Sequence, residues 1–194
     1  MFEVGRNKCG GHRSPLQFKL KIISGGQTGV DRAALDVALK HGIQCGGWCP
    51  AGRLDEFGRI PDRYPLRELV GGFTERTLQN VKDSAGTVII YSGKLSGGTE
   101  QTVRFCVEQQ RPHQLIDASK ISTEDAAKLI VDFVREHEID ILNVAGPRES
   151  EWQEGYDYAF RALDAFADKL VGRLCQTPNQ TQAPLHNFTR NVAL

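Results

Sequence analysis

Three short segments rich in glycine carry the residue types that proteins use to hold anions. The first reads S-G-G-Q-T-G-V-D and covers residues 24–31, between a short apolar run and a predicted helix. It supplies five candidate phosphate-binding residues: Gly25, Gly26, Gln27, Thr28 and Gly29. Glycine lets the backbone approach a ligand closely, and the first amides of a helix attract anions. The segment predicts a phosphate-binding loop, although a tight strand-to-helix turn without a ligand explains the same glycines.

The second segment, S-G-K-L-S-G-G-T at residues 92–99, repeats this pattern at another predicted helix start. Its candidates for phosphate contacts are Gly97, Gly98 and Thr99, and Glu100 follows directly. The first segment has neither the G-x-G-x-x-G spacing of dinucleotide-binding loops nor the lysine of a P-loop. Two loops of this kind on one sheet edge favour an anion site over two unrelated turns.

The third glycine segment and one further segment offer arginines. In A-G-P-R-E-S, residues 145–150, Arg148 could bind an anion bidentately or pair with a neighbouring glutamate at the surface. In W-C-P-A-G-R, residues 48–53, Arg53 could reach a phosphate and Trp48 could stack on a ring. Packing of Trp48 in the core accounts for that residue equally well.

The sequence shows no pair of groups suited to acid–base catalysis. It has no G-x-S-x-G motif and no plausible Ser-His-Asp set, which leaves Glu100, Glu149 and Asp31 as carboxylates of undefined role. Asp31 also suits the positive end of a helix dipole, and it could contact a sugar hydroxyl or a base. Glu100 is therefore a weak catalytic candidate, and the catalytic residues stay undefined.

No metal site is predicted. His41, Cys45 and Cys49 are spaced at four residues, but Gly42 ends the predicted helix between them and removes the helical geometry. The chain also lacks a C-x2-C pair.

Strands and helices must alternate to present these loops. Apolar runs predict strands at 20–24, 43–47, 87–91, 113–117 and 141–145, and helical periodicity predicts helices at 31–41, 74–84, 99–110, 122–137 and 152–170. Residues 48–72 show no sustained period, and their aromatic and aliphatic side chains predict a packed, functional segment. This order indicates an α/β protein with a mainly parallel sheet of about five or more strands. Ligands bind at the carboxyl ends of such strands, so the three glycine loops are expected to converge there.

The charge, the apolar runs and the cysteines of the sequence indicate which classes of protein fit poorly. The 194 residues contain 24 basic and 24 acidic side chains, so no global charge favours nucleic acid or an anionic membrane. No apolar run approaches the ~20 residues that span a bilayer. The five cysteines lack disulfide-framework spacing, which favours reduced thiols in a cytoplasmic protein. We expect a flexible leader at residues 1–17, one domain at 18–171 and a C-terminal tail at 172–194.

Five motifs taken together resemble a known family. GGQTGVDRAALDVAL, GWCPAGRLDEFGRIPDRYPLRE, TLQNVKDSAGTVIIY, SGGTEQT and NVAGPRES occur in this order over roughly residues 19–170. They look like those of the bacterial proteins named "putative molybdenum carrier", and WCPAGR and AGPRES are the most specific. The resemblance implies a Rossmann-like three-layer sandwich. It also implies a distant relation to lysine-decarboxylase-like proteins and to cytokinin-activating phosphoribohydrolases.

The resemblance further implies a ligand, the molybdenum cofactor (molybdopterin), which is a pterin with a phosphate and a dithiolene-held metal. A carrier would protect or deliver this molecule; otherwise the ligand is a phosphate-bearing nucleotide. The matching positions are those of the glycine motifs and the two arginine motifs, namely Gly25, Gly26, Thr28, Gly29, Arg53, Gly97, Gly98, Thr99 and Arg148.

Departures from the related enzymes keep alternatives open. The phosphoribohydrolases carry P-G-G-x-G-T-x-x-E with a catalytic glutamate, whereas this chain has S-G-G-T-E-Q-T, so Glu100 does not inherit that role. Ala85 stands where an acid is expected in such families. The alternatives are a nucleotide N-glycosidic hydrolase and a nucleotide-sensing module. A homodimer or higher homo-oligomer is expected, formed through helices on the sheet faces.

Overall fold

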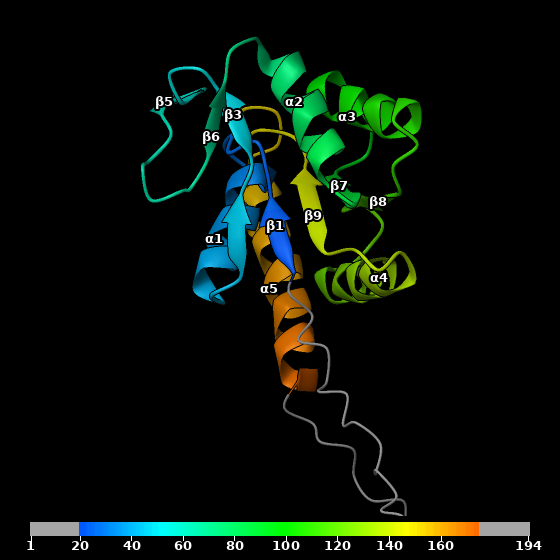
Figure 1. The fold of residues 1–194 in the computed structure, drawn as a ribbon. Helices are drawn as coiled ribbons and strands as arrows, with labels where there is room; N and C mark the ends of the chain where they lie inside the picture. Colours follow the sequence, from blue (N-terminus) through cyan, green and yellow to red (C-terminus); the bar gives the residue numbers. More distant parts are fainter. Residues whose placement is uncertain (1–19, 175–194) are drawn as a thin grey trace, which may run out of the picture.

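Five parallel strands form the central sheet of the computed structural model, which describes residues 20–174 (Figure 1). Every pairing within this sheet is parallel, as the alternation of strands and helices predicted. In spatial order the strands are β2 (Gln44–Gly46), β1 (Lys21–Ile23), β9 (Ile141–Ala145), β7 (Gly86–Tyr91) and β8 (His113–Asp117). The central position of β9 matters for function, because it lies between the two strands that precede the glycine loops.

Helices cover both faces of the sheet and complete a three-layer α/β sandwich (Figure 1). One face is covered by α1 (Val30–Lys40), α4 (Thr123–Glu136) and α5 (Gly155–Leu174), and the other by α2 (Phe73–Asp83) and α3 (Gly97–Glu108). Strand β7 shows why two layers form. Val88 and Ile90 pack with the first group of helices, whereas Ile89 between them packs with the second. Successive side chains of a strand point to opposite faces, so an all-apolar strand requires helices on both sides.

The segment from residue 48 to residue 72 forms four very short strands. β3 (Trp48–Pro50) pairs in parallel with β6 (Arg67–Leu69), and β4 (Leu54–Asp55) forms an antiparallel hairpin with β5 (Gly58–Arg59). Their connections bury a small second core, made of Leu35, Cys49, Ile60, Tyr64 and Leu66. The predicted packing of this segment is confirmed, while strands of two or three residues are too short to show a period in sequence.

Side-chain hydrogen bonds are found at the starts of α2 and α4. Ser122 caps α4 by accepting a hydrogen bond from the Asp125 amide at 3.1 Å. Helix α2 begins one residue before its predicted start at 74, because Gly72 is its cap and Glu75 accepts a hydrogen bond from the Gly72 amide at 2.7 Å. The predicted leader at 1–17 lies outside the described residues, as does the predicted tail at 172–194 from residue 175 on, whereas residues 172–174 of that tail belong to the last helix, which ends at Leu174.

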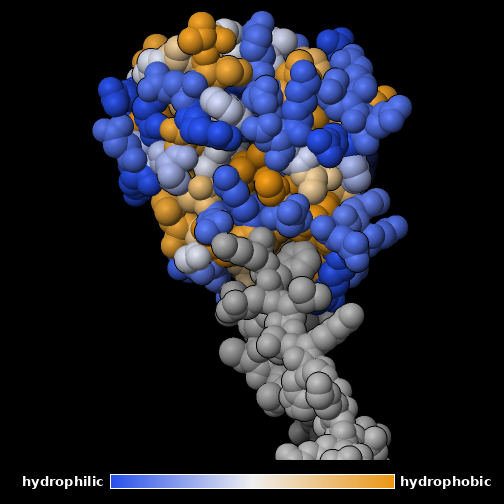
Figure 2. Space-filling view, viewed as in Figure 1, coloured by the Kyte–Doolittle hydropathy of each residue, from blue (hydrophilic) through white to orange (hydrophobic). Residues whose placement is uncertain are grey.

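The face of the domain that Figure 2 shows is mainly polar. Figure 2 shows hydrophilic residues over most of one face, with hydrophobic groups in smaller patches between them. Among the exposed apolar side chains, Leu54 and Phe57 belong to the β4–β5 hairpin, and Val70 and Phe73 lie at the entry to α2. No helix among residues 20–174 is long and apolar enough to cross a membrane.

Candidate functional site

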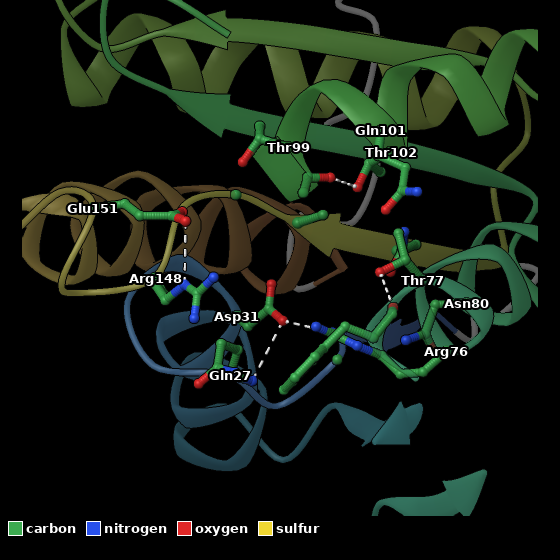
Figure 3. A pocket seen from close by; sticks show the side chains of 16 residues that line it. Gln27, Asp31, Arg76, Thr77, Asn80, Thr99, Gln101, Thr102, Arg148 and Glu151 are labelled. Atoms are coloured by element: carbon green, nitrogen blue, oxygen red, sulfur yellow. Dashed lines mark hydrogen bonds and ion pairs between the residues drawn. The ribbon is translucent and has the colours of Figure 1, made fainter. Parts of the chain in front are cut away.

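The loops that follow β1, β7 and β9 meet at one cavity, as expected from a parallel sheet (Figure 3). The cavity measures about 650 Å³ when its open mouth is included. Without the open solvent at its mouth the cavity volume is about 100 Å³, which is below the roughly 300–1,000 Å³ that is common for small-molecule sites. A fourth wall comes from α2, which lies next to α3 on the same face of the sheet.

The first glycine loop contributes Gly25 and Gln27 to the cavity wall. Two of its glycines have left-handed backbone conformations, Gly26 with φ of 71° and Gly29 with φ of 68°. At Gly29 a Cβ atom would lie 2.6 Å from the carbonyl oxygen of Pro147, so the loop after β9 packs directly on this glycine. Close backbone packing therefore accounts for part of the glycine pattern independently of any ligand.

Thr28 belongs to this loop but is not among the residues that line the cavity. Its hydroxyl donates a hydrogen bond to the carboxylate of Glu56 and accepts one from the Glu149 amide at 3.1 Å. Glu56 comes from the β4–β5 hairpin, and Glu149 from the loop after β9. The hydroxyl predicted to contact phosphate is thus engaged within the protein.

The second glycine loop opens α3. Gly98 and Thr99 line the cavity, Thr99 is 4% exposed, and Gly97 holds a left-handed φ of 55°. The first amides of a helix have no partner within the helix, so this terminus offers donors and a positive dipole end to an anion. Glu100 is exposed and is not among the cavity-lining residues.

The two predicted arginines have different surroundings. Arg148 lines the cavity, and its Nε donates to Glu151 at 3.1 Å in a half-exposed ion pair. The guanidinium of Arg53 is buried and donates to three backbone carbonyls, those of Pro61, Tyr64 and Leu66, at 2.9–3.1 Å. The structure does not bring Arg53 to the cavity, because the chain from residue 60 to residue 66 wraps around its side chain.

Trp48 also lies away from this cavity. Its indole nitrogen donates to Asp83 at 2.7 Å, and the guanidinium of Arg67 stacks over its ring at 4.0 Å. The side chain of Asn80 binds both the amide and the carbonyl of Trp48, which ties β3 to α2. Trp48 therefore has a structural role in this arrangement.

The sequence reasoning missed several cavity residues on α2 and β9. Arg76 points into the cavity, and its Nη1 lies 3.2 Å from Oδ2 of Asp31 (Figure 3). Phe73 stands at the first position of the same helix with its side chain about half exposed. Asn143 lies in the middle of β9, is 2% exposed and donates to Thr87 at 3.3 Å. A polar residue within the apolar run I-L-N-V-A was the available signal for Asn143.

The floor of the cavity contains the nearly buried ion pair of Asp31 and Arg76. Burial raises the pKa of Asp31, and this effect outweighs the nearby Arg76 guanidinium and the Gln27 amide, which act in the opposite direction. The cavity thus contains two arginines, Arg76 and Arg148, each paired with a carboxylate, Asp31 or Glu151. Among residues 20–174 no group of three His, Cys, Asp or Glu side chains could hold a metal ion.

Comparisons with known proteins show the family of this chain. Residues 22–167 match the model of the circularly permutated YpsA SLOG family. The chain belongs to this family. It is also similar to the crystal structure of the "putative molybdenum carrier protein" from Syntrophus aciditrophicus SB. The two are 48% identical over 76% of this chain and 95% of the other, with a TM-score of 0.75. A comparison with curated proteins finds no match. The resemblance drawn from the five motifs is confirmed.

Proposed function

We propose that this member of the SLOG family binds a small phosphorylated heterocycle at the cavity and carries it. The observation that supports this most directly is the convergence of three strand-end loops with Arg76 and Arg148 around one opening. Family membership and the name of the similar crystal structure support a ligand-binding role. The remaining details follow from the chemistry of the walls.

The phosphate of the ligand is expected where the start of α3 meets the two arginines of the cavity. The free amides at the start of α3, beside Gly98, lie on one side, and the guanidinium groups of Arg76 and Arg148 lie on others. Helix amides and arginine forks are both preferred partners of phosphate oxygens. A bound phosphate would share each arginine with the carboxylate that holds it in place.

The ring of the ligand is expected at the mouth. Phe73 lines the cavity and is 52% exposed, so one face of its ring is available to a planar heterocycle. Aromatic stacking contributes about 0.5–1.5 kcal/mol beyond the apolar area that is buried. A pterin with a phosphate has both features, and so has a nucleotide. We favour the molybdenum cofactor as cargo because the similar crystal structure is named a molybdenum carrier.

Carriage is better supported than hydrolysis. The carboxylates that line the described cavity are Asp31 and Glu151, and both are engaged by arginines. Hydrolysis of an N-glycosidic bond needs a carboxylate available to the reacting carbon or to water. Glu100, the residue closest to the enzyme motif in sequence, is exposed outside this lining.

Native mass spectrometry of gently purified protein tests the proposal, with the released ligand identified by fragmentation. A bound pterin of molybdenum-cofactor mass would support the carrier, and the same spectrum would report the oligomeric state. A nucleotide would support the site but replace the cargo. Protein that binds neither molecule when both are added would contradict the proposal.

A further inference from the structure

The β4–β5 hairpin lies against the first glycine loop and is held there by polar contacts. Arg32 of α1 donates to Asp55 of the hairpin at 2.7 Å and to the carbonyl of Gly26 at 3.1 Å. The apolar side chains of the hairpin, Leu54 and Phe57, are 52% and 70% exposed and contribute little burial. Specific hydrogen bonds therefore determine where this hairpin sits.

Glu56, at the tip of the hairpin, makes further hydrogen bonds to the loops after β1 and β9. Its carboxylate accepts from the hydroxyl of Thr28, from the amide of Ser150 at 3.2 Å and from the hydroxyl of Ser150. Its own amide donates to Oε1 of Gln27 at 3.0 Å, and this oxygen also accepts from the Thr28 amide at 3.1 Å. One side chain thereby joins the loop after β1 to the loop after β9.

The charge state of Glu56 agrees with this role. Burial by itself raises the pKa of this carboxyl, but hydrogen bonds from Ser150 and Thr28, together with the charge of Arg148, lower it overall. Glu56 is accordingly ionised at neutral pH, and charge-assisted hydrogen bonds are stronger than neutral ones.

We propose that Glu56 is a positioning residue, which clamps the loops after β1 and β9 together and so fixes Gln27 and Arg148 in the cavity wall. The hydroxyls of Thr28 and Ser150 serve the clamp rather than the ligand. Anion contacts then fall to the start of α3, Arg76 and Arg148. The structural part of this proposal stands on the hydrogen bonds alone, and its effect on binding rests on the proposed function.

Hydrogen exchange of the full-length protein tests the clamp, by comparing Glu56→Ala with Glu56→Gln. A glutamine oxygen can accept from Thr28 and the Ser150 amide, and the Ser150 hydroxyl can reverse to accept from the glutamine NH₂. We expect faster exchange in peptides covering residues 25–29 and 147–151 for Glu56→Ala, and wild-type exchange for Glu56→Gln. Arg59→Gln is the matched control on the same hairpin, since the Arg59 side chain is 65% exposed and pairs with Asp62.

Two results would overturn the clamp. Glu56→Ala could exchange like wild type in both loops, which would mean that the Glu56 carboxylate does not hold them. Alternatively, faster exchange in Glu56→Ala could be confined to residues 54–59 of the hairpin, which would leave both loops independent of Glu56.

Calorimetric titration with inorganic phosphate separates the clamp from a competing role. We expect Glu56→Ala to weaken phosphate binding roughly tenfold, the equivalent of one hydrogen bond to a charged group, with Glu56→Gln close to wild type. Tighter binding by Glu56→Ala would mean that the carboxylate competes with the ligand, and would overturn the proposal. Wild-type protein that binds no phosphate would contradict the proposed function instead, while the exchange data would still decide the clamp.

Discussion

Arg76 of α2 and Asp31 of α1 form a nearly buried ion pair across the cavity floor. Arg76 Nη1 lies 3.2 Å from Asp31 Oδ2, and the two side chains are 12% and 6% exposed. Gly25 leaves room for the pair, because a Cβ atom at this position would fall 1.2 Å from the same nitrogen. The pair thus links a residue far along the chain to the first glycine loop, and it accounts for one glycine of that loop.

The ion pair predicts a large stability effect for Asp31→Ala. Removing the carboxylate leaves the Arg76 charge in a buried site, which typically costs about 3–5 kcal/mol of unfolding free energy. Urea denaturation measures this change. Asp62→Ala is the control, since Asp62 is 78% exposed in its pair with Arg59 and should have little effect. Equal effects of the two substitutions would argue against a buried pair.

Gly25→Ala should displace Arg76. The new methyl group would overlap Nη1 and would also lie 2.7 Å from Asp31 Oδ2. We expect a loss of about 1–3 kcal/mol of unfolding free energy, typical of overpacking. The loss should be smaller in an Arg76→Ala background, so a double-mutant cycle detects the contact. Gly98→Ala is the control, because nothing lies within 4 Å of a Cβ atom there. Strictly additive effects would contradict the clash.

Substitution of Arg53 should lower the stability of the protein, and substitution of Arg148 should lower its affinity for phosphate. Arg53→Ala removes three hydrogen bonds to backbone carbonyls. The carbonyls of Pro61 and Tyr64 keep a backbone amide donor, while that of Leu66 loses its donor. Hydrogen bonds of charged groups contribute roughly 1.5–3 kcal/mol each. We expect a clear loss of stability and no direct loss of a ligand contact. Arg148→Ala breaks a half-exposed pair with little effect on stability. It should weaken phosphate binding by about 1.5–3 kcal/mol if the guanidinium contacts the ligand.

Denaturation and phosphate titration of both variants check this separation. The opposite pattern, a stable Arg53→Ala that fails to bind and an unstable Arg148→Ala that binds normally, would reverse the assignment.

The sheet and the convergence of its loops could be predicted from the sequence. Apolar runs located the five strands, and the carboxyl ends of parallel strands share one edge whatever their spatial order. The wall formed by α2 could not be predicted in the same way. Arg76 lies in T-E-R-T, which has the polar character of an ordinary solvated helix face. Its place at the cavity depends on α2 packing beside α3, which is a tertiary relationship.

Arg53 and Thr28 are the converse case, in which the sequence suggested an anion contact and the structure shows the side chain bound within the protein. Both stand in motifs typical of anion binding, and both have side chains that the fold engages elsewhere. The partners responsible, the carbonyls at 61–66 and the Glu56 carboxylate, belong to a segment without periodicity. A sequence pattern identifies donors, but it does not show which acceptors the folded chain brings to them.

Two tyrosines should make the protein less stable at high pH. Burial, followed by nearby carboxylates, raises the pKa of Tyr158 to about 12, and Tyr156, which donates to Asp36, also reaches about 12. Between about pH 10 and 12 the unfolded chain loses these protons while the folded chain keeps them, so the unfolding free energy falls as pH rises. Tyr158→Phe should make this decline shallower in urea denaturation across that range. A decline as steep as in wild type would rule out the contribution of Tyr158.

Glu100→Gln distinguishes carriage from hydrolysis. Glu100 lies in the first turn of α3 with an exposed side chain, outside the residues that line the cavity. Because Glu100 does not line the cavity, we expect the variant to bind nucleoside monophosphates as wild type does, with no base released by either protein. Chromatography of the reaction mixture measures base release, and Arg148→Ala serves as a control with weakened binding. Turnover by wild type that disappears in Glu100→Gln, with affinity retained, would make Glu100 catalytic and the protein a hydrolase.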